Sequence, residues 1–105
     1  GAVDDAAFAE SRARRLQRTG RSRRATLAHL RDKGVDAETA AAALPDGEDA
    51  ELDAALAFCR RRRIGPFARG EGTPEARLKA LGALARAGFG HEIASRALRM
   101  APDVA

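Results

Sequence analysis

Several residue types are scarce in this sequence, and each shortage excludes a class of protein. Cys59 is the only cysteine among 105 residues, so no disulfide can form within the chain. One thiol and two histidines, His29 and His91, fall short of the ligand sets that hold zinc, and we expect neither a metal nor another cofactor. The sequence shows no run of about 20 apolar residues and no signal-peptide pattern, so we expect a soluble cytoplasmic protein.

Aromatic residues are also rare, with four phenylalanines and no tyrosine or tryptophan, while Ala, Leu, Arg and Glu dominate. Such a composition favours α-helix throughout, and we predict an all-α fold. Residues that cap helices, together with glycine and proline breaks, predict six helices at about 5–18, 22–33, 36–44, 48–63, 74–87 and 91–100. The predicted caps are Asp4 or Asp5, Ser22, Asp36 and Thr73.

The second half of the sequence repeats the first. Residues 30–44, LRDKGVDAETAAAAL, share six identical positions with residues 84–98, LARAGFGHEIASRAL, at an offset of 54. Residues 5–8 match 53–56 at an offset of 48, which places six extra residues in a loop near 65–73. We therefore predict two tandem three-helix repeats, residues 1–45 and 46–105, in an elongated, right-angled or curved helical array. Arrays commonly need about three units, so we expect an upstream unit to be missing.

The positions that correspond in the two units are best explained by packing and by turns. Gly34 and Gly88 are placed to end a helix in the left-handed conformation. We predict that the structural residues are Phe8, Leu16, Leu27, Leu30, Gly34, Val35, Leu44, Leu56, Ile64, Leu81, Leu84, Gly88, Phe89 and Leu98. Phe67 has no counterpart in the first unit, and either packs against the array or contacts a partner.

Positive charge is concentrated in one part of the chain. The sequence has 17 arginines and two lysines, and from 11 to 31 it contains eight arginines and no acidic residue. A GC-rich genome would explain the number of arginines, but not their clustering. Three of them, Arg21, Arg23 and Arg24, crowd the start of the second predicted helix, where the helix dipole disfavours positive charge. Because stability does not explain them, we predict that they bind an acidic or phosphate-bearing partner.

The other arginines have structural explanations as well as functional ones. Arg14, Arg15 and Arg18 lie on the expected solvent face of the first helix, and Arg61 and Arg62 end the fourth, where cations stabilise free carbonyls. We keep these five as further candidates for partner or phosphate binding.

Arg12 and Arg60 differ from the other arginines, because they fall within the apolar arcs of their helices. Since a buried charge needs a partner, we predict that each meets a carboxylate near a helix junction.

The order of three motifs resembles that of the RecX family of bacterial recombination regulators. They are VDDAAFA at 3–9, GRSRRATLAHLRDKGVDAE at 20–38 and RLKALGALARAGFGHEIASRAL at 77–98. No single motif is specific, but their spacing is, and the resemblance covers nearly the whole chain. In that family an Asp-Asp-x-x-Phe-Ala start, a basic helix and a Gly-Val type of turn recur within tandem three-helix repeats, with a further unit ahead of the first motif. The resemblance implies binding to the RecA recombinase filament on single-stranded DNA, usually as an inhibitor, and we expect a monomer.

The sequence also bears on two other functions. A helix-turn-helix DNA-binding protein is suggested by the three-helix units and the basic charge, but the expected recognition helix, AETAAAAL, has almost no side chain that can hydrogen-bond a base edge. Non-specific contact with DNA phosphates, weakening with salt, remains open. Neither histidine has a nucleophile and a carboxylate in a recognisable order, so we expect no enzyme.

Overall fold

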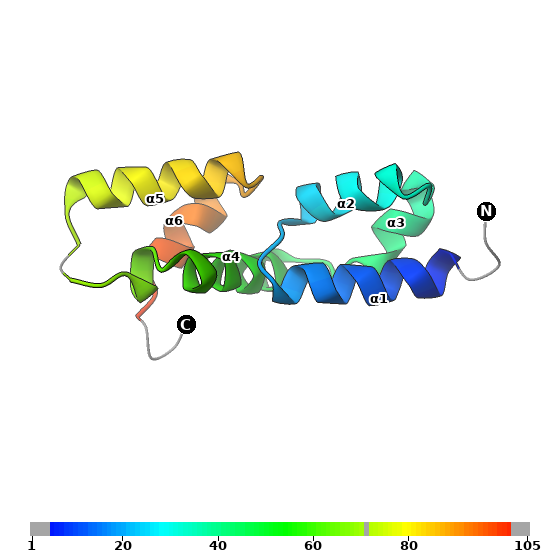
Figure 1. The fold of residues 1–105 in the computed structure, drawn as a ribbon, viewed down its shortest axis with the longest axis horizontal. Helices are drawn as coiled ribbons and strands as arrows, with labels where there is room; N and C mark the ends of the chain where they lie inside the picture. Colours follow the sequence, from blue (N-terminus) through cyan, green and yellow to red (C-terminus); the bar gives the residue numbers. More distant parts are fainter. Residues whose placement is uncertain (1–4, 71, 102–105) are drawn as a thin grey trace.

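The computed structural model describes residues 5–70 and 72–101, and within them the chain is helical with no strand. The elements are α1 (Asp5–Arg18), α2 (Arg23–Asp32), α3 (Ala37–Ala43), α4 (Glu48–Arg62), the short 3₁₀ helix η1 (Gly65–Phe67), α5 (Pro74–Arg86) and α6 (His91–Arg99). The molecule is elongated, with extents of 51 × 23 × 20 Å. Figure 1 shows α1, α2 and α3 together at one end and α4, α5 and α6 at the other. The predicted all-α tandem array is confirmed.

Three helices begin where a polar side chain caps them. The Ser22 hydroxyl accepts the Ala25 N–H at 3.0 Å, and the Thr73 hydroxyl accepts the Ala76 N–H at 3.0 Å. The Asp36 carboxylate accepts the Thr39 N–H at 2.8 Å, and this bond lowers the pKa of Asp36 below its usual value. These caps agree with the prediction, whereas Asp4 lies outside the described residues.

The turns after α2 and α5 have the same geometry. Gly34 and Gly88 adopt φ values of +89° and +98°, which favour glycine. The Val35 N–H then donates to the Leu30 carbonyl, and the Phe89 N–H donates to the Leu84 carbonyl, both at 3.0 Å. This six-residue closure satisfies carbonyls that a helix end would leave free. The repeat in the sequence therefore encodes a repeated turn as well as repeated helices.

Each three-helix unit has its own apolar core. In the first unit the buried cluster consists of Ala9, Ala13, Leu30, Val35, Ala40 and Leu44. In the second it consists of Leu52, Ala54, Ala55, Leu56, Cys59, Leu84, Phe89, Ala94 and Ala97. Five of the predicted structural side chains are only half-buried: Leu16, Leu27, Ile64, Leu81 and Leu98.

The structure corrects the prediction that Phe8 belongs to the core. Its residue is 38% exposed, although its position in the repeat matches the buried Leu56. Its ring instead supports the Arg12 guanidinium, which lies 5.1 Å from the ring centroid. Phe67, in the inserted segment, packs against the second core while the Arg60 guanidinium lies 4.6 Å from its ring centroid. Of the two alternatives for Phe67, the structure shows packing.

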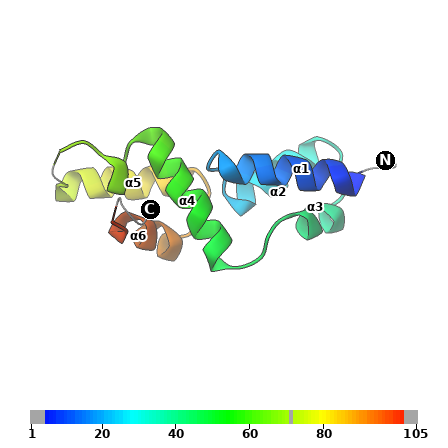
Figure 2. The same ribbon diagram turned by 90° about the horizontal axis from the view of Figure 1, so that it is seen from below.

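The two units meet through close backbone contact. Gly20, between α1 and α2, has φ +92°, and a Cβ atom there would lie 2.6 Å from the backbone nitrogen of Phe58 in α4. Ser22 is fully buried, and its hydroxyl donates to the Ala87 carbonyl at the end of α5, at 2.9 Å. In both views α2 and α5 lie end to end along the long axis (Figures 1 and 2). The positive end of one helix thus faces the negative end of the other. No described helix is both long and apolar enough to cross a membrane.

Candidate anion-binding groove

A large open groove runs across the junction between the two units. Its volume is about 820 Å³, and its walls come from α1, α2, α4, α5 and the turn at Gly20. It is lined by Arg12, Arg15, Leu16, Thr19, Gly20, Arg21, Ala25, His29, Phe58, Arg61, Arg62, Arg86 and Ala87. Six of these residues are arginines and none is a carboxylate, so we refer to this feature as the arginine groove.

The junction explains why these arginines converge. Because Gly20 has no side chain, the turn between α1 and α2 lies directly against the α4 backbone near Phe58. This contact aligns the later half of α1, which carries Arg15, with the last turn of α4, which carries Arg61. The Ser22 bond to Ala87 brings the end of α5 to the same place. The groove therefore exists only where both units are assembled.

The positive charge of the groove is not neutralised by the described part of the chain. Two ion pairs occur among the described residues, Arg23 with Asp46 at 3.7 Å and Arg96 with Glu48 at 3.1 Å, and neither involves a groove arginine. A concave surface lined by one sign of charge concentrates the electrostatic potential and attracts oppositely charged groups. The groove is thus suited to a carboxylate-rich surface or a phosphate backbone.

Two groove arginines are held by aromatic rings. The Arg12 guanidinium lies over Phe8, and the Arg62 guanidinium lies 5.0 Å from the centroid of Phe58. Stacking of this kind fixes the planar guanidinium without removing its charge. The predicted carboxylate partner for Arg12 is not found among residues 5–70 and 72–101; its described contacts are the Phe8 ring and His29. Arg60, predicted to be internal, is exposed.

His29 lies half-buried in the groove beside Arg12. Arg12 Nη1 is 3.3 Å from His29 Nε2, and because a guanidinium can only donate, Nε2 must accept. Burial lowers the pKa of His29 below its ordinary 6.5, and the nearby charges of Arg12, Lys33 and Arg21 lower it further, against a smaller opposing effect of Asp32. The imidazole is therefore neutral at pH 7, and the arginines carry the positive charge of the groove.

The arginines predicted from the sequence separate into two groups. Arg15, Arg21, Arg61 and Arg62 line the groove. Arg14, Arg18, Arg23 and Arg24 do not, and Arg23 and Arg24 instead border a shallower depression beside Leu27 and Arg31. The candidate set is thus spread over more than one surface.

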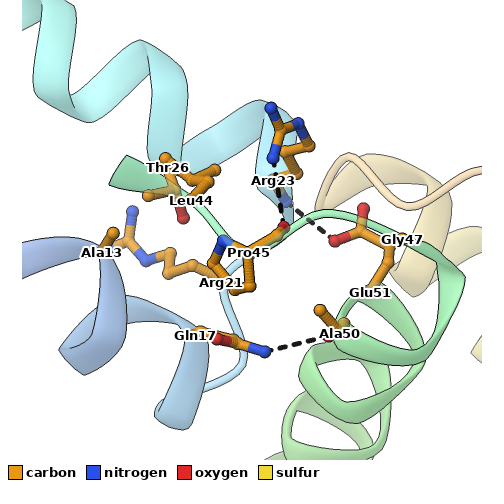
Figure 3. A pocket seen from close by; sticks show the side chains of 10 residues that line it. All are labelled: Ala13, Gln17, Arg21, Arg23, Thr26, Leu44, Pro45, Gly47, Ala50 and Glu51. Carbon is orange, nitrogen blue, oxygen red and sulfur yellow. Dashed lines mark hydrogen bonds between the residues drawn. The ribbon is translucent and has the colours of Figure 1, made fainter. Parts of the chain in front are cut away.

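The structure corrects the prediction of an anion-binding site at the start of α2. The backbone N–H of Arg23 already donates to Glu51 Oε1 at 3.0 Å (Figure 3). The Ser22 hydroxyl accepts the Ala25 N–H. The Arg23 guanidinium donates to the Pro45 carbonyl at 3.2 Å and pairs with Asp46. The prediction that this helix start carries unpaired arginines is therefore wrong for Arg23, because Asp46 in the connection before α4 pairs with its guanidinium and Glu51 in α4 accepts its backbone N–H.

Sequence reasoning missed three basic residues of the groove: Arg12, His29 and Arg86. The sequence places Arg12 in an internal ion pair, and Arg86 lies 65 residues after Arg21 in the chain. The signal that would have found them is the repeat itself, because stacking two units places the end of α5 beside the start of α2.

Comparisons with known proteins agree with this architecture. Residues 4–44 match the family description "RecX, second three-helix domain". The chain is 41% identical over 104 residues to the regulatory protein RecX of Agrobacterium fabrum, covering 99% of this chain and 55% of that protein. It is 42% identical over 105 residues to the regulatory protein RecX of Myxococcus xanthus, covering 97% and 56%.

A third relative, the regulatory protein RecX of Thermobifida fusca, is 38% identical over 100 residues, covering 94% of this chain and 54% of that protein. The chain therefore spans about half the length of the curated relatives it matches. No solved structure matches it. With tandem three-helix units in the structure and these matches over nearly its whole length, the chain belongs to the RecX family, as the resemblance of its motifs predicted.

Proposed function

We propose that this chain regulates the RecA recombinase by binding its filament on single-stranded DNA and restraining ATP turnover and strand exchange. Two considerations support the proposal. The relatives are named regulatory proteins RecX, and the motif resemblance implies the RecA filament as the partner. The chain spans about half of each relative, so the proposal concerns what these residues contribute to that regulation.

The observation that carries the proposal is the arginine groove. A nucleoprotein filament presents carboxylates and phosphates, and both match the planar fork of arginine better than the ammonium of lysine. The groove brings six such forks together, two of them positioned by aromatic rings, with no described carboxylate to neutralise them. The stability of the fold does not explain this surface, because crowded like charges repel one another.

Direct binding to nucleic acid without sequence preference is a second candidate. The same groove favours it, since phosphate contacts supply most non-specific affinity. Sequence-specific recognition is not supported, because the exposed side chains of α3 are Ala37, Glu38, Ala41 and Ala42, which offer little to a base edge.

The test is recombinase ATPase on single-stranded DNA with three forms of the chain. The groove variant replaces Arg15, Arg61 and Arg62 by Gln. The control variant replaces Arg14, Arg18 and Arg24 by Gln, which removes the same charge from exposed arginines outside the groove. If each lost contact contributes about 1 kcal/mol, the groove variant needs on the order of a hundredfold more protein for the same effect. The control variant remains close to the unmodified chain.

Equal losses in the two variants would show that total charge, and not the groove, produces the effect. Binding to bare single-stranded DNA separates the two candidate functions. The recombinase proposal predicts weak binding that is lost near physiological salt, while inhibition of the recombinase persists. Tight binding to bare DNA, with inhibition that disappears whenever DNA binding is blocked, would favour the second candidate.

A further inference from the structure

Within residues 5–70 and 72–101, the two units carry equivalent hollows, one filled and one open. In the first unit, Gln17, Arg23, Thr26 and Leu44 line a hollow, which we call the first seat. In the second unit, Gly65, Arg77, Ala80 and Leu98 line another, the second seat. These residues correspond one to one at the repeat offsets, 48 for the first pair and 54 for the others. The seats are therefore the same feature of the repeat, built twice.

The first seat receives the beginning of α4. Gly47, Ala50 and Glu51 of this helix start also line the seat, as do Pro45 of the connection between the units and Ala13 and Arg21 of the first unit (Figure 3). Gln17 Nε2 donates to the Ala50 carbonyl at 3.1 Å, and Glu51 accepts the backbone N–H of Arg23. Only about 30 Å³ of space remains. The occupant is thus a helix start with small residues and a carboxylate in its first turn.

The second seat has a volume of about 450 Å³ among the described residues. Its walls are mostly apolar, formed by Ala68, Pro74, Ala76, Ala80 and Leu98, and within the described part of the chain Arg77 is the one charged residue that lines it. One difference from the first seat concerns the backbone N–H of the arginine. Because α5 begins at Pro74 with its own cap, the Arg77 N–H already donates to the Thr73 carbonyl at 2.9 Å. A carboxylate in this seat would therefore meet the guanidinium of Arg77 and not its backbone.

We propose that the second seat binds the first turn of a helix from a partner protein, and that this turn carries a carboxylate. The apolar walls suit small side chains of the kind that α4 places in the first seat, and the lone positive charge of Arg77 complements a Glu or Asp. The seat includes the start of α5, whereas the arginine groove includes its end. The two surfaces are therefore separated by the length of this helix, which Figure 1 shows. The proposal goes beyond the recombinase proposal and does not depend on it.

The experiment uses a synthetic peptide of residues 44–62, which contains the helix start that fills the first seat. The peptide is titrated into the ¹⁵N-labelled 105-residue chain, and amide shifts are followed by NMR. We expect saturable shifts at residues 73–80 and at Leu98. The Arg77→Glu variant should weaken binding about two- to fivefold, the range expected for an exposed ion pair. Lys79→Glu, the same charge change on the same helix outside the seat, should have a clearly smaller effect.

Two further variants make the result decisive. Ala76→Leu fills the seat with a good helix former at an exposed position and should abolish the shifts without unfolding the chain. A peptide with Gln at the position of Glu51 should bind the unmodified chain more weakly than the native peptide does, but more tightly than the native peptide binds Arg77→Glu, because Gln removes the attraction without adding repulsion between like charges. Shifts confined to the arginine groove, or binding that is unaffected by both Ala76→Leu and Arg77→Glu, would overturn the proposal. Neither outcome bears on recombinase ATPase, which tests the groove separately.

Discussion

The two units follow one plan but differ in the size of their cores. Among the described residues, the first core has six buried apolar side chains, three of them alanine, and two partly buried ones packed on it. The second has nine, including Phe89, and eight partly buried ones, among them Phe58, Ile64 and Phe67. The stability of a repeat array is the sum of one term for each unit and one for each interface. The second unit, with its larger core, therefore contributes more stability, and the first unit depends on its contact with the second. The unit with the smaller core also carries the arginine cluster at 12–31.

The candidate functional surface lies where the two units meet. The arginine groove is built from both units, so its geometry depends on the junction at Gly20 and Ser22 and not on either core alone. We therefore expect substitutions in the second core to affect the whole chain, and substitutions at the junction to affect the groove out of proportion to their cost in stability.

The strongest test of unequal cores compares Leu30→Ala with Leu84→Ala. The two leucines are fully buried at equivalent positions, one in each core. Truncation of a buried leucine costs about 2 to 5 kcal/mol, and more where many neighbours lose contacts. We expect Leu84→Ala to fall near the upper end and Leu30→Ala near the lower end in urea unfolding followed by circular dichroism. Equal costs, or the reverse order, would contradict the comparison.

The next largest effect is expected at the junction between the units, where Gly20→Ala is compared with Gly34→Ala. Both glycines have positive φ, so alanine at either position costs about 1 to 2 kcal/mol from the backbone alone. At Gly34 nothing lies near the added Cβ, whereas at Gly20 the Cβ would contact the α4 backbone. We expect Gly20→Ala to lower the melting temperature more than Gly34→Ala and to weaken recombinase inhibition as well. A Gly20→Ala protein with the melting temperature of Gly34→Ala would show that the units are not held in this contact.

A smaller effect is expected from Ser22→Ala, with Thr73→Ala as its control. Each substitution removes a helix cap, at about 1 kcal/mol. Ser22 also bridges the units through the Ala87 carbonyl, which would be left without this donor. We expect Ser22→Ala to cost about 1 kcal/mol more than Thr73→Ala in the same unfolding assay. If the two costs are the same, the bond between the units does not stabilise the chain.

The smallest expected effect is a pH dependence of the free energy of unfolding, which arises from His29 in the first unit. The folded pKa of His29 is below its unfolded value of 6.5, so the unfolded chain takes up the proton more readily. The free energy of unfolding should therefore be highest above pH 6.5 and should fall as the pH drops from there through the lower folded pKa. His29→Gln should remove this component, because its side chain does not titrate in that range. An unchanged pH dependence in His29→Gln, measured by urea unfolding between pH 5 and 7.5, would contradict the assignment.

The fold followed from the sequence because its signals are local. Ser22, Asp36 and Thr73 cap their helices through atoms three residues away, and Gly34 and Gly88 act within one turn. The repeat in the sequence provided the one long-range prediction, that the chain forms two stacked units. Phe8 was misplaced because a helical wheel shows a face but not what covers it.

The site was only partly predictable because it depends on contacts between the units. Half of the candidate arginines line the groove, and the local charge pattern was enough to suggest them. Arg23 was misjudged because its carbonyl and carboxylate partners, Pro45, Asp46 and Glu51, come from the connection between the units and the start of α4. Arg86 was missed because nothing near it in the sequence indicates that α5 ends beside α2.

Arginine labelling tests most directly whether the groove is the surface that the partner contacts. The chain is treated with an arginine-specific dicarbonyl reagent, with and without recombinase filaments on single-stranded DNA, and modification is quantified by mass spectrometry. We predict that filaments protect Arg15, Arg61, Arg62 and Arg86 in the groove, while Arg14, Arg18 and Arg31 continue to react. Protection of the second set with free reaction of the first would contradict the account.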